Sequence, residues 1–144
     1  MKKFIVSIDA GTTSNRAILF DLKGKPVFSS QKEFTQYFPK SGWVEHDPEE
    51  IWRTTVKTLR DVIAKAKKLK GKILTIGITN QRETTVLWDK KKGKPVYKAI
   101  VWQDRRQEEF CKKLRQQNKD TMIFNKTGLL IDSYFSGTKI KWIL

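Results

Sequence analysis

The sequence has very few of the residues that build thiol and zinc sites. Its 144 residues include one cysteine, Cys111, and one histidine, His46. A lone cysteine excludes an internal disulfide and suits a reducing compartment, and the Cys/His spacing of a zinc finger is absent. Cys111 stands beside Phe110 in a helical pattern, so we interpret it as core filler rather than a nucleophile. We interpret His46 as a hydrogen-bonded loop residue rather than a base.

Long apolar runs are absent as well. The run at residues 4–8, FIVSI, is too short to cross a bilayer and ends at Asp9. No segment resembles a signal peptide. Together with the single thiol, this predicts a cytoplasmic protein without a membrane span.

Acidic residues are scarce relative to basic ones. The chain has 30 Lys and Arg against 15 Asp and Glu, a net charge of +15, with cations densest at residues 65–72 and 90–98. Clustered cations release counterions from phosphates and can bind nucleic acid. Neither cluster has the aromatic spacing of an RNA-binding sheet. We therefore favour a solvated basic surface and expect non-specific nucleic-acid binding at most.

The first third of the chain predicts strands followed by a helix. Residues 4–8, 16–21 and 27–34 are strand-like with short turns between them, which indicates an antiparallel meander. Asp47 and Pro48 then mark a helix start, and Glu50 is placed to complete a capping box. The helix is expected to end at Gly71 and to bury the apolar residues at helical spacing: Trp52, Val56, Leu59, Ile63 and Ala66.

The remaining elements alternate between strands and helices. Residues 73–78 read as a strand buried on both faces, and residues 84–88 and 96–101 as two further strands around a polar turn. A helix is expected over 104–117 and a shorter one over 119–125. Ser136 is expected to cap a last helix that contains Ile140, Ile143 and Leu144. Because nothing follows these apolar residues, we expect the chain to be the front part of a longer protein.

The order of these elements predicts the fold class. Three strands, a helix and another strand, then short strands and helices, are typical of the ribonuclease-H-like half of an actin-like ATPase fold. This is an α/β fold, a mixed sheet with helices on its faces. In such folds ligands gather at strand ends and tight turns.

A strand end of this kind occurs at residues 8–17, IDAGTTSNRA. Gly11 allows close backbone approach, and the hydroxyl groups of Thr12, Thr13 and Ser14 add donors for phosphate oxygens. Arg16 adds a cation, and Asp9 offers a carboxylate for Mg²⁺. The alternative is an ordinary hairpin whose Thr and Ser side chains satisfy turn amides. A P-loop is excluded because its G-x-x-x-x-G-K-[ST] pattern does not occur.

Five stretches resemble the amino-terminal region of the FGGY carbohydrate kinases. They are DAGTTSNRA at 9–17, GWVEHDPEEIW at 42–52, GITNQRETT at 77–85, AIVWQDRR at 99–106 and TGLLIDSYFSGTKIKWIL at 127–144. The motifs NQRETT, VWQ-RR and SYFSGTK, in that order, resemble the glycerol kinase branch of the family. The resemblance extends over essentially the whole chain.

The resemblance implies ATP-dependent phosphorylation of glycerol to sn-glycerol 3-phosphate by the parent protein. It implies that Thr12, Thr13, Ser14 and Arg16 bind the nucleotide phosphates and that Asp9 holds Mg²⁺ through water. It also implies that residues 1–144 are the amino-terminal part of the first kinase domain. The second, nucleotide-closing domain and the general base, an Asp, would lie beyond residue 144. On that basis the isolated chain should be inactive.

The resemblance assigns glycerol to Arg82, Glu83, Trp102 and Tyr134. These residue types suit a triol, because they supply hydrogen-bond donors, acceptors and a flat apolar wall. Alternatively, Arg82 and Glu83 form a surface pair, Trp102 belongs to the core and Tyr134 caps a loop. Adjacent residues on a regular strand point to opposite faces. Arg82 and Glu83 can therefore share a ligand only if the backbone leaves extended geometry near Gln81.

Two positions depart from the family pattern. Ala10 stands where the family often has Gln, and Asp104 stands where several glycerol kinases have Cys. We expect Asp104 to orient Arg105 or to frame the pocket, without a catalytic role.

Three functions remain open from the sequence. The favoured one is a glycerol kinase represented by its first part, acting on glycerol and ATP together with the remainder of the chain. The others are a non-catalytic ligand-binding module and a basic nucleic-acid-binding domain. The sequence leaves the oligomeric state open.

Overall fold

The structure, a computed structural model, describes all 144 residues and divides into two compact units. Unit 1 comprises Met1–Thr35 and Asp47–Gln81, and unit 2 comprises Gln36–His46 and Arg82–Leu144. No helix in either unit is both long and apolar enough to cross a lipid bilayer.

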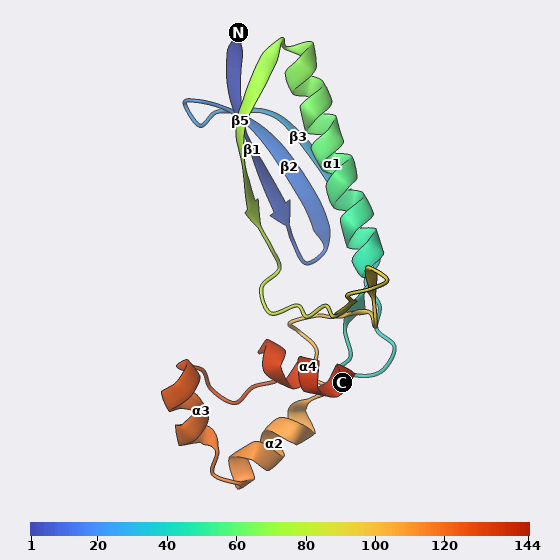
Figure 1. Cartoon of the computed structure of the whole chain (residues 1–144), viewed down its shortest axis with the longest axis vertical. Coiled ribbons are helices and arrows are strands. Elements are labelled where there is room, and N and C mark those ends of the chain that lie inside the picture. The colour runs from blue at the N-terminus through green and yellow to red at the C-terminus, as the bar shows by residue number, and fades with distance from the viewer. The chain divides into compact units, whose positions relative to one another are not determined.

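Unit 1 is built on a four-stranded mixed sheet. Strands β1 (Lys2–Ala10), β2 (Ser14–Asp21) and β3 (Pro26–Glu33) form the expected antiparallel meander, and β5 (Gly71–Thr79) runs parallel to β1. The strand order is β3-β2-β1-β5. Helix α1 (Pro48–Lys68) precedes β5 in the chain and lies along the sheet (Figure 1). The predicted mixed sheet is confirmed.

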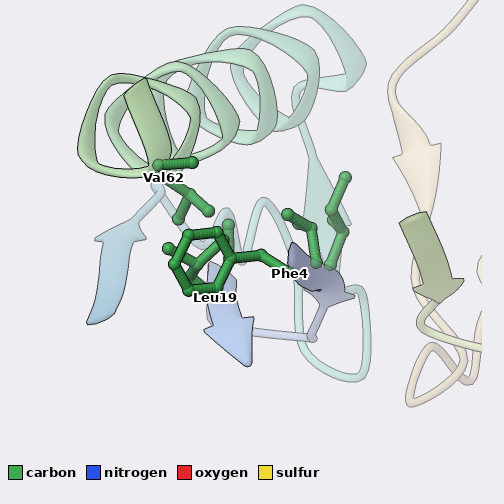
Figure 2. Packing of buried hydrophobic residues seen from close by; sticks show 7 residues of the cluster. Phe4, Leu19 and Val62 are labelled. Carbon is green, nitrogen blue, oxygen red and sulfur yellow. The ribbon is translucent and has the colours of Figure 1, made fainter. Parts of the chain in front are cut away.

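The core of unit 1 lies between α1 and one face of the sheet. Figure 2 shows Val62 of α1 facing Leu19 of β2 and Phe4 of β1. The buried cluster consists of Phe4, Val6, Ile8, Ala17, Leu19, Val62 and Ala66. At the other end of α1, the buried amide of Asn15 donates to Ile51 O at 2.9 Å and to Thr54 Oγ1 at 2.6 Å. This ties the start of β2 to the first turns of the helix.

The start of α1 agrees with only part of the prediction. Asp47 is the N-cap, and its carboxylate accepts from Glu49 N at 2.9 Å, with Pro48 in the first turn. The capping box is wrong, because Glu50 instead accepts from Thr35 N and Thr35 Oγ1, both at 3.2 Å. Trp52 is not part of the core. Its side chain is 63% exposed, since the helix turns Thr58, Val62 and Ala66 toward the sheet.

Gly71 has a packing role rather than the predicted role of ending α1. The helix ends at Lys68 with Leu69 as the C-cap, and Lys70, not Gly71, takes the left-handed conformation with φ of 51°. Gly71 begins β5, opposite Lys2. A Cβ atom on Gly71 would lie 2.1 Å from Cε2 of Phe4. The glycine therefore makes room for a core aromatic ring.

The prediction that residues 73–78 are buried on both faces is wrong. Leu74, Ile76 and Ile78 are 48%, 43% and 73% exposed. The reason is the position of β5 at the edge of the sheet, where β1 is its one neighbour, while α1 lies mainly over β2 and β3.

Unit 2 combines short strands with three helices. Strand β4 (Glu45–His46) pairs with β8 (Ala99–Ile100), and β6 (Trp88–Asp89) forms a hairpin with β7 (Lys94–Pro95). The two longer strands predicted over 84–88 and 96–101 are therefore wrong. The helices are α2 (Glu108–Gln116), α3 (Asp120–Thr127) and α4 (Ser136–Ile143).

The helices of unit 2 begin at other residues than predicted. Helix α2 starts at Glu108, not at 104, because the preceding residues form turns bonded to the Asp104 carboxylate. Ser136 is the first residue of α4 rather than its cap, which is Phe135. Cys111 is buried, and burial raises the pKa of its thiol, which confirms its role as core filler. His46 is also buried, with Nε2 2.6 Å from Gln36 Oε1, and is hydrogen-bonded as expected.

We predict that Gly71→Ala destabilises unit 1 by about 1–3 kcal/mol, because the added methyl group displaces the Phe4 ring from a filled core. Urea unfolding of the purified chain measures this. The matched control is Gly77→Ala on the same strand, where an added Cβ would meet nothing within 4 Å. The control should be neutral or more stable by up to about 1 kcal/mol. Equal effects at the two glycines would refute the packing role.

Candidate functional site

The predicted phosphate-binding residues lie at the turn between β1 and β2. Asp9 is near the end of β1, Thr12 and Thr13 lie in the turn, and Ser14 opens β2. Gly11 N donates to Ser14 O at 3.0 Å, and a Cβ atom on Gly11 would lie 3.0 Å from the same oxygen. The predicted tight turn at the end of this strand is confirmed, and it leaves little room for a side chain at position 11.

The charged side chains at this turn share one face of the sheet. Asp9 and Arg16 are directly opposed on the antiparallel pair β1–β2, so their side chains lie on the same side. Both residues are exposed. Gln31 of β3 orients the group: its Oε1 accepts from Arg16 Nε at 3.0 Å, and its Nε2 donates to Ser14 Oγ at 2.9 Å. This end of the sheet thus presents a held guanidinium and a carboxylate to solvent.

The same turn offers one carboxylate to a metal. No group of three or more His, Cys, Asp and Glu side chains is placed to bind an ion anywhere in the chain. Asp9 fits Mg²⁺ as a single carboxylate that contacts the ion through water, because Mg²⁺ commonly keeps several of its waters.

The residues predicted to bind a polyol belong to unit 2, where the geometric requirement on Arg82 and Glu83 is met. Strand β5 ends at Thr79, residues 82 and 83 form a turn, and Glu83 has a φ of 62°. A positive φ is uncommon for a residue other than glycine and stores strain. No regular strand runs through 80–85, so the two side chains are not forced to opposite faces.

The Glu83 carboxylate sits at the amino terminus of α4. Its Oε2 accepts from Ser136 N at 2.9 Å and from Ser136 Oγ at 2.7 Å. A carboxylate is favoured there because the first amides of a helix lack intrahelical partners. Both bonds use Oε2, which leaves Oε1 to accept from a ligand. Glu83 thus bonds to Ser136 rather than pairing with Arg82, whose side chain is exposed.

Trp102 and Tyr134 form a half-buried aromatic corner. Their ring centroids are 6.0 Å apart at an interplanar angle of 67°, and Tyr134 also packs against Phe135 at 5.1 Å. The Trp102 amide lies 3.4 Å from Oγ1 of Thr84, the residue after Glu83. The structure therefore brings Glu83, Trp102 and Tyr134 together. It leaves Arg82 beside them in the chain but exposed.

The segment that carries Tyr134 is held from α2 and the turn before it. Asp132 Oδ1 accepts from Tyr134 N at 2.7 Å and from Arg105 Nη1 at 3.0 Å. Arg105 Nη1 also donates to the buried Ser133 Oγ at 3.0 Å. Arg105 is thus a positioning residue for this segment, which the sequence did not indicate.

Asp104 orients Arg106, not Arg105 as predicted. Asp104 Oδ1 accepts from Arg106 Nε at 2.9 Å, Oδ2 accepts from Arg106 Nη2 at 2.8 Å, and Oδ2 also accepts from Val44 N at 2.7 Å. Arg106 Nη2 donates to Glu45 at 2.7 Å, and the Trp43 ring lies 3.7 Å from its guanidinium carbon. The ion pairs are buried. Although burial opposes the charge of Arg106, the hydrogen bonds that it donates to Asp104 and Glu45 raise its pKa overall.

The apolar cavity among the helices of unit 2 is not a suitable polyol site. About 410 Å³ lies among α2, α3 and α4, walled by apolar side chains that include Phe110, Leu114, Ile123 and Leu130. Glu83 reaches its wall, but Arg82, Trp102 and Tyr134 do not. A triol needs several polar partners, so the aromatic corner beside Glu83 suits it better.

Sequence reasoning missed Lys139, which is fully buried in α4. Its ammonium donates to the main-chain carbonyl of Tyr134. Burial lowers the pKa of Lys139 to about 8, against the opposing effect of Glu83. A signal was present: Phe135, Lys139 and Ile143 recur every four residues, which places the lysine on one helical stripe with two apolar residues.

We predict that Arg106→Met destabilises unit 2 by about 3–5 kcal/mol, because it leaves Asp104 and Glu45 buried without their cation. Near-ultraviolet circular dichroism during thermal unfolding reports this, since Trp43 and Trp142 flank the guanidinium. The control is the adjacent Arg105→Met, whose ion pair with Asp132 is about half exposed. That change should cost about 1 kcal/mol or less. Similar losses for both variants would contradict the assignment.

Comparison with known proteins identifies the family of the chain. The sequence of residues 4–144 matches the N-terminal domain of the FGGY family of carbohydrate kinases. Glycerol kinase of Oceanobacillus iheyensis is 62% identical over 143 residues, and that of Malacoplasma penetrans is 60% identical over 143 residues. Each alignment covers 99% of this chain, but 29% and 28% of the respective relative.

Solved structures agree with this result. Plasmodium falciparum glycerol kinase, crystallised with ADP, superimposes with a TM-score of 0.91 at 39% identity and covers 99% of this chain and 28% of that protein. Gluconate kinase of Lactobacillus acidophilus superimposes with a TM-score of 0.89 at 24% identity. The match covers 99% of this chain and 28% of the gluconate kinase chain. At this identity, the match shows only that the two proteins share a fold. The actin-like ATPase fold class expected from the sequence is confirmed. The chain spans less than a third of the length of these relatives, and it belongs to the FGGY family of carbohydrate kinases.

Proposed function

We propose that this chain is the glycerol-binding and phosphate-binding part of a glycerol kinase. The parent protein would transfer the γ-phosphoryl group of ATP to the 3-hydroxyl of glycerol and release sn-glycerol 3-phosphate and ADP. The observation that carries this proposal is the 62% identity to a curated glycerol kinase along 99% of the chain.

The geometry of unit 2 supports glycerol as the ligand. Glu83 has a free carboxylate oxygen to accept from a hydroxyl, and Tyr134 can donate or accept beside it. Trp102 offers a flat wall to the carbon chain, held edge-on against Tyr134. Arg82 is exposed on the same turn as Glu83 and can add a forked donor.

The geometry of unit 1 supports binding of the nucleotide phosphates. Thr12, Thr13 and Ser14 supply hydroxyl groups in one tight turn, and Gln31 holds Arg16 ready to meet a phosphate oxygen. Asp9 would hold Mg²⁺ through water, and the ion would neutralise charge on the transferring group when bound. The similar Plasmodium protein was crystallised with ADP, which fits the use of ATP.

The chain supplies positioning rather than proton transfer. Phosphoryl transfer is accelerated mainly by alignment and electrostatic stabilisation, which both groups of residues can provide. The general base and the closing domain are assigned to the remainder of the kinase. The free, buried Cys111 suits a reducing compartment, and we place the reaction in the cytoplasm.

We predict that Glu83→Gln lowers kcat/KM for glycerol by roughly 10- to 100-fold, because an amide accepts a weaker hydrogen bond than a carboxylate. The KM for ATP should stay within about twofold, since unit 1 carries the phosphate residues. A chimera measures this, with residues 1–144 joined to the remaining part of a similar glycerol kinase. The control is Glu109→Gln at an exposed position of α2. Loss of ATP affinity alone would argue against the polyol role of Glu83.

We also predict that the isolated chain binds glycerol without phosphorylating it. Glycerol should quench tryptophan fluorescence saturably in the wild type, because Trp102 is assigned to the proposed glycerol site. The quenching should disappear in Glu83→Ala. With ATP and Mg²⁺ present, no glycerol-dependent ADP should form, since the residues assigned to the base lie outside the chain. ADP release from the purified chain would overturn this division of roles.

A further inference from the structure

Lys139 is buried in an unusual way for a lysine. Lysine almost never becomes fully buried unless it is paired, yet the exposed fraction of Lys139 is 0% and its ammonium donates to a main-chain carbonyl, that of Tyr134. The ammonium also lies 5.9 Å from the centre of the Tyr134 ring. An apolar residue at this helical position would avoid the desolvation cost, so the charge calls for a local reason.

The surroundings of Lys139 are acidic on balance. Burial lowers the pKa of its ammonium to about 8, while Glu83, Asp104 and Asp132 oppose this shift and Arg105 adds to it. These groups come from the turn after β5, the turn before α2 and the segment before α4. Each of these three segments also carries or adjoins a residue assigned to the polyol site.

The bond from Lys139 completes the fixation of Tyr134. Asp132 accepts from the Tyr134 amide at 2.7 Å, and Lys139 donates to its carbonyl. Two residues further on, Ser136 carries the amide and hydroxyl that hold Glu83. Lys139 therefore holds the short segment from Tyr134 to Ser136, which carries Tyr134 and binds Glu83.

We propose that Lys139 is a positioning residue for the polyol, whose buried ammonium holds segment 132–136 so that Tyr134 and Glu83 keep their polar atoms toward the same substrate. This inference rests on the proposed function. Lys139 has no contact with the substrate itself, because it is covered by protein. Its effect passes through the Tyr134 carbonyl.

The test compares Lys139→Met with Lys141→Met in the chimera described above. Both changes remove a lysine from α4, but Lys141 is exposed. Lys139→Met should raise the glycerol KM roughly tenfold or more, the effect of losing a hydrogen bond from a charged group. The ATP KM should stay within about twofold, and Lys141→Met should change neither constant. An unchanged glycerol KM in a folded Lys139→Met variant overturns the proposal.

A pH profile separates positioning from general destabilisation. Because burial lowers the pKa of the Lys139 ammonium to about 8, the glycerol KM of the wild type should rise between pH 7 and 9. Lys139→Arg keeps a cation that does not titrate in this range. This variant should therefore bind glycerol more tightly than Lys139→Met, and its glycerol KM should change little between pH 7 and 9. A profile that keeps its rise near pH 8 in Lys139→Arg overturns the role of this ammonium.

A double-mutant cycle with Tyr134→Phe tests whether the effect passes through the tyrosine. If Lys139 acts by placing the Tyr134 hydroxyl, the combined loss should be smaller than the product of the two single losses. Independent, multiplicative losses would place the action of Lys139 elsewhere and overturn the proposal.

Failure of the proposed function can be told apart from failure of this inference. If the wild-type chimera does not phosphorylate glycerol, the proposed function fails. The isolated chain then still reports on positioning through the NMR signal of the Trp102 indole N–H, because the Trp102 ring packs on Tyr134. A shift in Lys139→Met but not in Lys141→Met supports the positioning role, and an unmoved signal overturns it.

Discussion

The contact between the Glu83 carboxylate and the first residue of α4 is the constraint on which the arrangement of unit 2 depends. It lets Glu83 keep a φ of 62°, because two hydrogen bonds to Ser136 offset the strained backbone. Residues 82 and 83 form a turn after β5 has ended at Thr79, and both bonds use Oε2, so Oε1 of Glu83 stays available. The same contact fixes where α4 begins, and so where the preceding Tyr134 and the buried Lys139 lie. The strained turn at Glu83 and the capping of α4 thus depend on one interaction.

The two units are stabilised by different physical means. Unit 1 has an apolar core between α1 and the sheet, in which even a glycine is needed to fit Phe4. Unit 2 contains a buried charge network around Arg106 and a buried lysine. Apolar packing tolerates exchange of similar side chains, whereas a buried ion pair tolerates loss of neither partner. The residues proposed to bind glycerol in unit 2 therefore lie on a scaffold that specifies their orientation closely.

Local signals in the sequence predicted the fold well where neighbours along the chain decide it. Asp47 and Pro48 start α1, and the turns at Gly11 and after Asp21 define the meander. Errors arose where partners distant in sequence decide the outcome. Glu50 binds Thr35 instead of its own helix, β5 is exposed because it lies at the sheet edge, and residues 84–101 form strands only two residues long. The site residues came from resemblance, and their mutual contacts, like the burial of Lys139, needed the fold.

If unit 2 binds glycerol as proposed, its arrangement would also discriminate ligands by their hydroxyl groups. Glu83 is held by Ser136 and Tyr134 is fixed through both of its main-chain polar groups, so neither can turn toward a substitute partner at low cost. A ligand that lacks a hydroxyl would leave one of these groups desolvated and unpaired, a penalty far larger than that for a missing methylene group. In a flexible pocket the unpaired group could turn to another partner, and the penalty would disappear. In the proposed glycerol site, the fixation by Asp132, Lys139 and Ser136 would therefore make ordinary hydrogen-bonding groups selective for a polyol.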